Sequence, residues 1–182
     1  NPSVTSLLLG LDFHAFANYQ LPNFKVAHPG GLYLGGDVGY NLLDTGQAGK
    51  ADDGTTIYTH SNIQYGLHLG YNFALTQNLQ WLMEGGYRYL GKAKQDASQS
   101  WFSIYTTRAQ AADLLFGLKY YVGSSTSLYG KLGAALQFLK LHNTNTAAMG
   151  GGSGPATEHR QNLNPEWQVG ISQNLGEYVS AN

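Results

Sequence analysis

Charged side chains that could form ion pairs or line a polar path are rare in this chain. Only 12% of its residues are charged and the net charge is -1, whereas about 25% is usual for a soluble domain. Glu84 and Arg88 stand at even positions of residues 79–89, and large apolar or aromatic residues fill most odd positions. Successive side chains of a strand point to opposite faces. The segment therefore predicts a strand with one apolar face and one face that carries charges of both signs.

Two ion pairs are predicted between this strand and the next one along the chain. The two strands should pair antiparallel, so facing residues have a nearly constant sum of residue numbers. That sum is 203 for Glu84 with Lys119 and 201 for Arg88 with Asp113, so a single register brings both pairs together. Two further charged residues are expected at this level. The predicted inner charge network is Asp37, Glu84, Arg88, Asp113, Lys119 and Lys131.

The same alternation recurs along the chain and predicts an all-β fold. Short turns at 76–78, 123–127 and 174–177 alternate with long polar segments at 44–61, 95–104 and 142–163. A length of 182 residues suits one domain, 1–182. Strands are predicted at 4–16, 31–43, 62–75, 79–94, 106–122, 128–141 and around 167–171, with an eighth beginning at 178.

The apolar face could meet either a protein core or lipid. A soluble up-and-down barrel such as a lipocalin would turn its apolar face inward. The predicted strands are about 11–16 residues long, whereas globular strands average 5–6 and a membrane strand needs roughly 9–11. The polar face is rich in small residues, and Tyr and Trp cluster near strand ends, as in interfacial girdles. We therefore expect these residues to face lipid: Tyr65, Leu67, Leu69, Tyr71, Phe73, Trp81, Met83, Tyr87, Tyr89, Leu114, Phe116 and Leu118.

Three motifs resemble the first strands of a known family. They are Gly-Leu-Tyr-Leu-Gly-Gly-Asp-Val-Gly-Tyr-Asn at 31–41, Gly-Leu-His-Leu-Gly-Tyr-Asn-Phe at 66–73 and Leu-Met-Glu-Gly-Gly-Tyr-Arg-Tyr-Leu-Gly at 82–91. In sequence and spacing the chain resembles the OmpA-like small eight-stranded outer-membrane barrels over about residues 31–176. The resemblance implies an antiparallel up-and-down transmembrane β-barrel of about eight strands in the bacterial outer membrane.

The strand order departs from that family. Residues 5–16 resemble the closing strand of such a barrel, yet here they come first, and the seventh family strand is reduced to 178–182. A permuted, truncated or engineered chain would explain this order, and so would a natural variant with an extra N-terminal strand. In either case 4–16 should run antiparallel to 31–43.

A structural or surface-interaction role through the long segments is the expected function, with the lumen plugged by the charge network. The expected partners are the lipid bilayer and lipopolysaccharide, with host or surface ligands at the loops and no nucleic acid. A small ion-conducting pore is the alternative, although eight strands leave an interior just filled by side chains.

A lipid A-modifying enzyme is the third hypothesis. His60-Ser61-Asn62 resembles a deacylase His-x-Ser-Asn motif, but no residue separates His60 from Ser61, so their side chains should point to opposite faces. We therefore expect no catalytic residue. The six histidines lack metal-ligand spacing and cysteine is absent, so no metal or cofactor is expected either. His68 is expected to form hydrogen bonds on the inner face.

Overall fold

The chain consists of long antiparallel strands joined by tight turns, as far as the structure describes it. The computed structural model describes residues 3–15, 30–44, 60–96, 103–145, 156–176 and 178–182. Among these residues, no helix is long and apolar enough to cross a membrane. The strands are β1 (Ser3–Ala15), β2 (Gly31–Asp44), β3 (His60–Ala74), β4 (Leu79–Asp96), β5 (Ser103–Tyr121), β6 (Thr126–Asn145), β7 (Ala156–Asn174) and β8 (Val179–Ala181).

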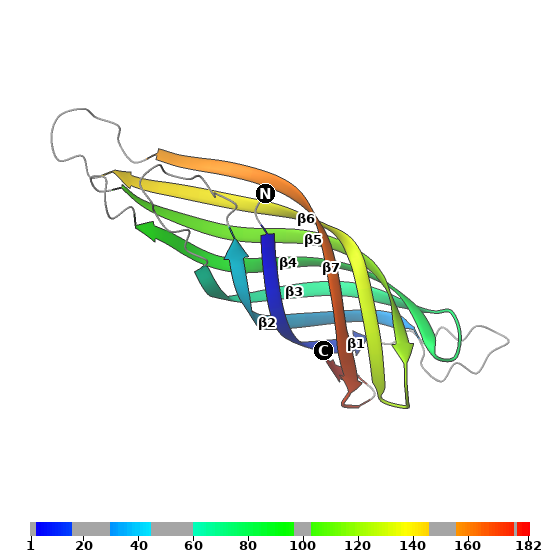
Figure 1. Ribbon diagram of the computed structural model, residues 1–182. Coiled ribbons are helices and arrows are strands. Elements are labelled where there is room, and N and C mark those ends of the chain that lie inside the picture. The colour runs from blue at the N-terminus through cyan, green and yellow to red at the C-terminus, as the bar shows by residue number, and fades with distance from the viewer. Residues whose placement is uncertain (1–2, 16–29, 45–59, 97–102, 146–155, 177) are drawn as a thin grey trace.

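The eight strands form a closed barrel in which each strand pairs antiparallel with its neighbours in the chain. The strands tilt together around the barrel, and β1 meets both β2 and the short β8 (Figure 1). This is the predicted all-β, up-and-down topology. The antiparallel pairing of the first two strands, with Leu7 opposite Tyr40 and Leu9 opposite Val38, is also confirmed.

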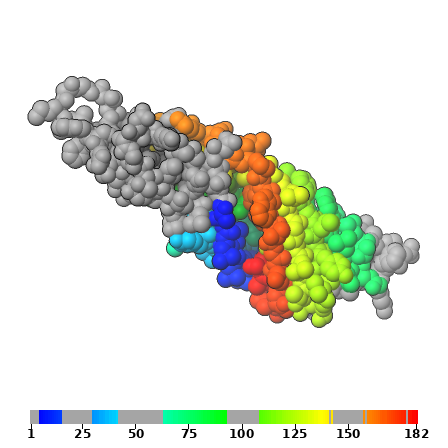
Figure 2. Space-filling model, in the orientation of Figure 1, coloured from blue at the N-terminus to red at the C-terminus, as the bar shows by residue number. Residues whose placement is uncertain are grey.

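β8 completes the ring only at the end of the barrel that carries the tight turns. It pairs with β1 from Leu11 to Phe13 and with β7 at Gln173 and Asn174. The backbones of Gly10 and Asn182 extend this pairing through two hydrogen bonds, of 3.0 and 2.9 Å. In the space-filling view β1 and β7 lie on the near face, with the C-terminal residues between them at the lower end (Figure 2).

The tight turns fix the register at this end of the barrel. The amide of Leu75 donates to the carbonyl of Leu79 at 2.9 Å, and the Thr76 hydroxyl accepts from the amide of Leu79 at 3.1 Å. The amide of Val122 likewise donates to the carbonyl of Thr126 at 3.0 Å. These hydrogen bonds satisfy backbone groups within each turn. β3 therefore pairs with β4, and β5 with β6, directly beside the turn that joins them.

Large apolar side chains cover the outside of the barrel on every strand from β1 to β7. Leu7 of β1 is 80% exposed, Leu132 of β6 is 70% exposed and Trp167 of β7 is 67% exposed. The inner face is buried and largely polar, with Gln64, Asn41 and Ser172 fully buried. This arrangement is opposite to that of a soluble barrel, which hides its apolar face. The apolar face therefore points away from the lumen.

All twelve side chains expected to face lipid lie on this outer face. Nine of them are exposed, and Tyr71, Trp81 and Tyr89 are half-buried because they pack against neighbouring rings. The Trp81 ring lies 5.9 Å from the Phe116 ring and 5.2 Å from the Phe73 ring, measured between centroids. Aromatic rings thus connect β3, β4 and β5 across the outside.

Several strands extend further into the predicted polar segments than the sequence indicated. β4 continues to Asp96, β6 continues to Asn145, and β7 begins at Ala156, within the segment assigned to a loop. The outer face of this part of β7 is polar at Gln161, so it lacks the apolar alternation used to find strands. β7 pairs along β6 throughout these residues, so backbone hydrogen bonding continues beyond the apolar band.

Candidate functional site

The inside of the barrel is crossed by hydrogen bonds and ion pairs that join strands on different sides of the lumen. Alternation places one side chain in every two on the inner face. Five acids lie there: Asp12, Glu84 and Asp113 are at most 9% exposed, and the side chains of Asp37 and Glu166 are 10% and 16% exposed. An unpaired charge is costly in such a place, so the partners of these acids define the site.

His68 of β3 lies between two carboxylates from different strands. Its Nε2 atom is 2.7 Å from Oδ1 of Asp12 on β1, and its Nδ1 atom is 3.4 Å from Oδ2 of Asp37 on β2. Asn182 donates from Nδ2 to the other oxygen of Asp12 at 2.6 Å. Gly35 lies beside Asp12 and His68, and a Cβ atom there would overlap both side chains. The imidazole thus joins β1, β2 and β3 across the inner face.

Glu84 of β4 accepts hydrogen bonds from two other walls of the barrel. The hydroxyl of Tyr33 on β2 donates to Oε2 at 2.6 Å, and Nζ of Lys131 on β6 donates to the same oxygen at 2.5 Å. The Tyr33 ring occupies the space that a Cβ atom would fill at Gly70 on β3. Glu84 therefore ties β2, β4 and β6 together at one level of the lumen.

Arg88 of β4 forms a second set of ion pairs above Glu84. Its Nε and Nη2 atoms donate to Oδ2 of Asp113 on β5 at 3.0 and 2.8 Å, and Nη2 also pairs with Glu166 on β7. Gln168 donates from Nε2 to Glu166 at 2.9 Å. Arg88 and Asp113 therefore form the pair that the sequence predicts. They are diagonal neighbours, because Arg88 directly faces Ala111, two residues away from Asp113.

The predicted pair of Glu84 with Lys119 is wrong. Facing residues of β4 and β5 have residue numbers that add up to 199 in this part of the sheet, so Lys119 lies opposite Gln80 rather than near Glu84. The Lys119 ammonium group donates to the Ser172 hydroxyl at 3.3 Å, and it lies 5.5 Å from the centre of the Tyr121 ring. The long connection between the two strands does not fix a register, which is why a sum of 201–203 could not be distinguished from 199.

Apolar residues of three neighbouring strands pack together on the inner face beside and above the ion pairs. Leu90, Ala109, Ala111 and Ala135 are at most 5% exposed and pack together, with Leu139 against them. Small residues on β5 and β6 leave room for the Leu90 side chain from β4. These residues form an apolar wall on β4, β5 and β6.

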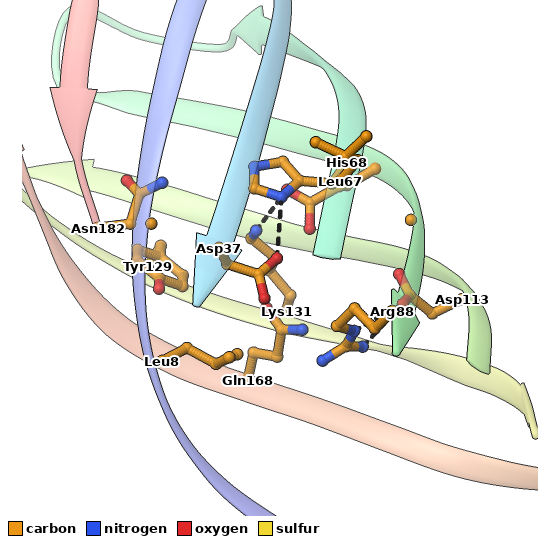
Figure 3. Close-up of a pocket in the computed structure, with 13 residues that line it drawn as sticks. Leu8, Asp37, Leu67, His68, Arg88, Asp113, Tyr129, Lys131, Gln168 and Asn182 are labelled. Atoms are coloured by element: carbon orange, nitrogen blue, oxygen red, sulfur yellow. Dashed lines mark hydrogen bonds and ion pairs between the residues drawn. The ribbon is translucent and has the colours of Figure 1, made fainter. Parts of the chain in front are cut away.

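A small cavity remains between the two sets of ion pairs. It measures about 40 Å³ and has polar lining residues from six strands, including Asp37, His68, Arg88, Asp113 and Lys131. Their side chains point into the lumen and approach one another (Figure 3). A single water needs roughly 10–15 Å³ by such a measure, so the cavity holds only a few waters.

Metal binding and catalysis were the other candidate chemistries. Among the described residues, no group of three His, Asp or Glu side chains could hold a metal ion. His60 and Ser61 are consecutive residues of β3, and their side chains lie outside those that the structure describes.

Three important lumen residues were missing from the predicted network. Asp12 alternates with Leu11 and Phe13, so the sequence predicts that its side chain points inward. The sequence does not predict its partner on another strand. Tyr33 resembled the aromatic residues of the outer face by type alone. Glu166 fell outside the short strand predicted around 167–171. Asp12 and Tyr33 reach their partners across a glycine of the strand between them, Gly35 and Gly70 respectively. Glu166 binds Arg88 from three strands away, and this contact depends on barrel curvature rather than on pairwise strand register.

A closed antiparallel ring with an apolar exterior and an interior filled by paired charges defines a transmembrane β-barrel. The family model of the outer membrane protein beta-barrel domain matches residues 4–182, so the chain belongs to that family. No curated protein and no solved structure matches the chain. The family assignment confirms the outer-membrane barrel indicated by the motifs at 31–41, 66–73 and 82–91.

Proposed function

We propose that this protein is a plugged barrel of the bacterial outer membrane that presents its long connections to the cell surface. The observation that carries the proposal is the set of cross-lumen bonds centred on Glu84 and Arg88. These bonds join β4 to β2, β5, β6 and β7. Ion passage would have to break paired, buried charges, which costs several kcal/mol for each one left unpaired.

The connections between β2 and β3, β4 and β5, and β6 and β7 would act as the interacting part. They leave the same end of the barrel, opposite the tight turns, and outer-membrane barrels place their longer loops outside the cell. Residues 45–59, 97–102 and 146–155 of these connections lie outside the described ones. A rigid barrel would hold them at the surface without itself taking part in binding or catalysis.

Conductance across a planar phosphatidylcholine bilayer tests the plug. The wild-type protein is expected to insert without stable current steps. The Glu84→Ala/Arg88→Ala variant removes both centres of the cross-lumen bonds and is expected to conduct, whereas Gln161→Ala on the outer face should remain silent. A stable open channel of the wild-type protein would overturn the plug.

A small ion-conducting pore is the second candidate, because a cavity with charged lining lies in the lumen. In that case the ion pairs would exchange partners to admit ions. This candidate would be favoured if the wild-type protein conducts and the Glu84→Ala substitution changes the ion selectivity of that current. A wild-type protein that gives no current would reject it.

The direction of the barrel is tested on intact cells. An epitope inserted between Asp52 and Asp53 should bind antibody without permeabilising the cells, and one inserted at Asn78 should not. The reverse result would place the long connections inside the cell and contradict the proposed role.

A further inference from the structure

Four basic side chains lie next to one another across four neighbouring strands. Lys92 of β4 faces Arg108 of β5, Arg108 faces Lys140 of β6, and Lys140 faces His159 of β7. All four residues are exposed. Directly facing residues point to the same side of a sheet, and neighbouring strands are about 4.8 Å apart, so this basic row is roughly 14 Å long.

The basic row is on the outside of the barrel. Arg108 is on the same face of β5 as the exposed Leu114, and His159 is on the same face of β7 as the exposed Leu163. Lys92 reaches this face because of a β-bulge between Tyr89 and Gly91. Without the bulge, its even number would place Lys92 inside with Glu84 and Arg88.

The basic row marks the upper edge of the apolar band. One outer-face step closer to the turns, the same strands carry Tyr89, Gln110, Phe138 and Gln161. The next step reaches Leu136 and the 72% exposed Leu163. Aromatic residues gather where hydrocarbon gives way to headgroups. The basic row therefore stands at headgroup level, on the side of the long connections.

The charges of the row have no acidic partner among the side chains that the structure describes. The acids whose burial is described, such as Glu84 and Asp113, point into the lumen. No ion pair within the described ranges includes Lys92, Arg108 or Lys140. Like charges that face each other destabilise a sheet, so the row is more stable when an anion lies along it.

We propose that the basic row binds the phosphate groups of a phosphorylated glycolipid in the outer leaflet. Arginine and lysine are the usual phosphate ligands of proteins, and juxtamembrane basic residues attract anionic lipid headgroups. The apolar band begins two outer-face steps below the row, where Leu163 is 72% exposed, so acyl chains attached to the same headgroup find apolar contacts. This second contact favours a lipid over a free phosphate ion.

Binding of fluorescent, bis-phosphorylated lipid A to the folded protein in detergent micelles tests the proposal. The Lys92→Gln/Arg108→Gln/Lys140→Gln variant is expected to bind at least about tenfold more weakly and to lose most of the salt dependence. The Gln110→Ala/Gln161→Ala variant changes the adjacent step of the same strands without changing charge, and it should bind like the wild type. Heat-modifiable gel mobility verifies that each variant is folded.

Two further arms identify the bound group. Dephosphorylated lipid A should bind the wild type and the triple variant equally, and inorganic phosphate should not displace lipid A at equal concentration. Unchanged lipid A affinity in the triple variant, or displacement by inorganic phosphate, would overturn the proposal.

The binding of lipid A requires an outer-membrane location but does not require a plugged lumen. If the wild-type protein conducts ions and the triple variant has lost lipid A affinity, only the plug is rejected. If the protein does not conduct and the triple variant keeps its full lipid A affinity, only the role of the basic row is rejected.

Discussion

At the scale of single residues, the lumen depends on shared acceptors rather than on isolated ion pairs. One oxygen of Glu84 accepts from both Tyr33 and Lys131, at 2.6 and 2.5 Å. Both donors come from strands that do not pair with β4. Removing this carboxylate therefore leaves a buried ammonium group and a buried hydroxyl without their acceptor.

The Glu84→Ala variant should be about 3–5 kcal/mol less stable than the wild type, because it breaks a buried charge pair. Gln64→Ala loses only neutral hydrogen bonds from Ser6 and Asn41, worth about 1 kcal/mol each. Urea unfolding in lipid vesicles measures both losses. The Glu84→Ala/Lys131→Ala variant should lose less than the sum of the two single variants. Equal losses for Glu84→Ala and Gln64→Ala would contradict a charge network at this level.

Gly70→Ala should weaken the same contact from the opposite side. A methyl group at Gly70 would overlap the ring of Tyr33, so the ring must move away from Glu84, at a cost of roughly 1–3 kcal/mol. Gly123→Ala is the matched control, because nothing lies within 4 Å of a Cβ atom there. Unfolding curves in urea compare the two variants. An equally stable Gly70→Ala protein would show that the ring position is not constrained.

Alternation of residue types gave the inward direction of the predicted charges, and strand pairing gave the correct partner for Arg88 but not for Glu84. The inward direction of Glu84, Arg88 and Asp113 follows directly from the two-residue period of a strand. The position of Lys119 along the barrel does not, because it depends on a register that no tight turn fixes between β4 and β5. Contacts such as Arg88 with Glu166 depend in addition on the closure of the ring.

At the scale of elements, the bulge in β4 separates two chemical environments on one strand. Below it, Glu84 and Arg88 point inward; above it, Lys92 is exposed on the outer face. Gly91 has a φ of 103°, a backbone conformation that favours glycine. One glycine therefore directs the basic end of β4 outward.

Gly91→Ala should be about 1–2 kcal/mol less stable, because alanine is strained at a positive φ. If the strain moves the bulge, Lys92 turns away from the basic row and lipid A affinity should fall as well. Gly85→Ala is the control on the same strand, since its Cβ atom would meet only the Asp113 carbonyl oxygen at an ordinary 3.7 Å. Stability is measured by urea unfolding. If Gly91→Ala is as stable as the wild type and as Gly85→Ala, Gly91 is not needed for the bulge.

The strands themselves were predicted well where they cross the apolar band and less well beyond it. β3 and β4 begin and end within two residues of the predicted strands 62–75 and 79–94. β7 was expected only around 167–171 but extends from Ala156 to Asn174. Pro165 and the polar Gln161 do not alternate like membrane strands, yet β6 supplies backbone partners along this whole stretch. Hydrogen bonding to a neighbour decides the strand there, and a single sequence does not contain that information.

At the scale of the whole molecule, the barrel has its apolar face outside and its charges inside. Backbone groups in hydrocarbon need partners within the protein, and a barrel of paired strands supplies them. The exposed apolar side chains of β1 to β7 form the outer band, whereas Glu84, Arg88 and Asp113 are buried. The outer band is therefore expected to contact lipid chains.

Trp167 reports on this claim directly, because it is 67% exposed on the outer face of β7. A Trp81→Phe/Trp101→Phe variant leaves Trp167 as the only tryptophan of the chain. In vesicles, lipids brominated along their acyl chains should quench its fluorescence strongly, and aqueous iodide should quench it weakly. Strong iodide quenching with no effect of brominated lipid would place Trp167 in water and contradict the membrane barrel.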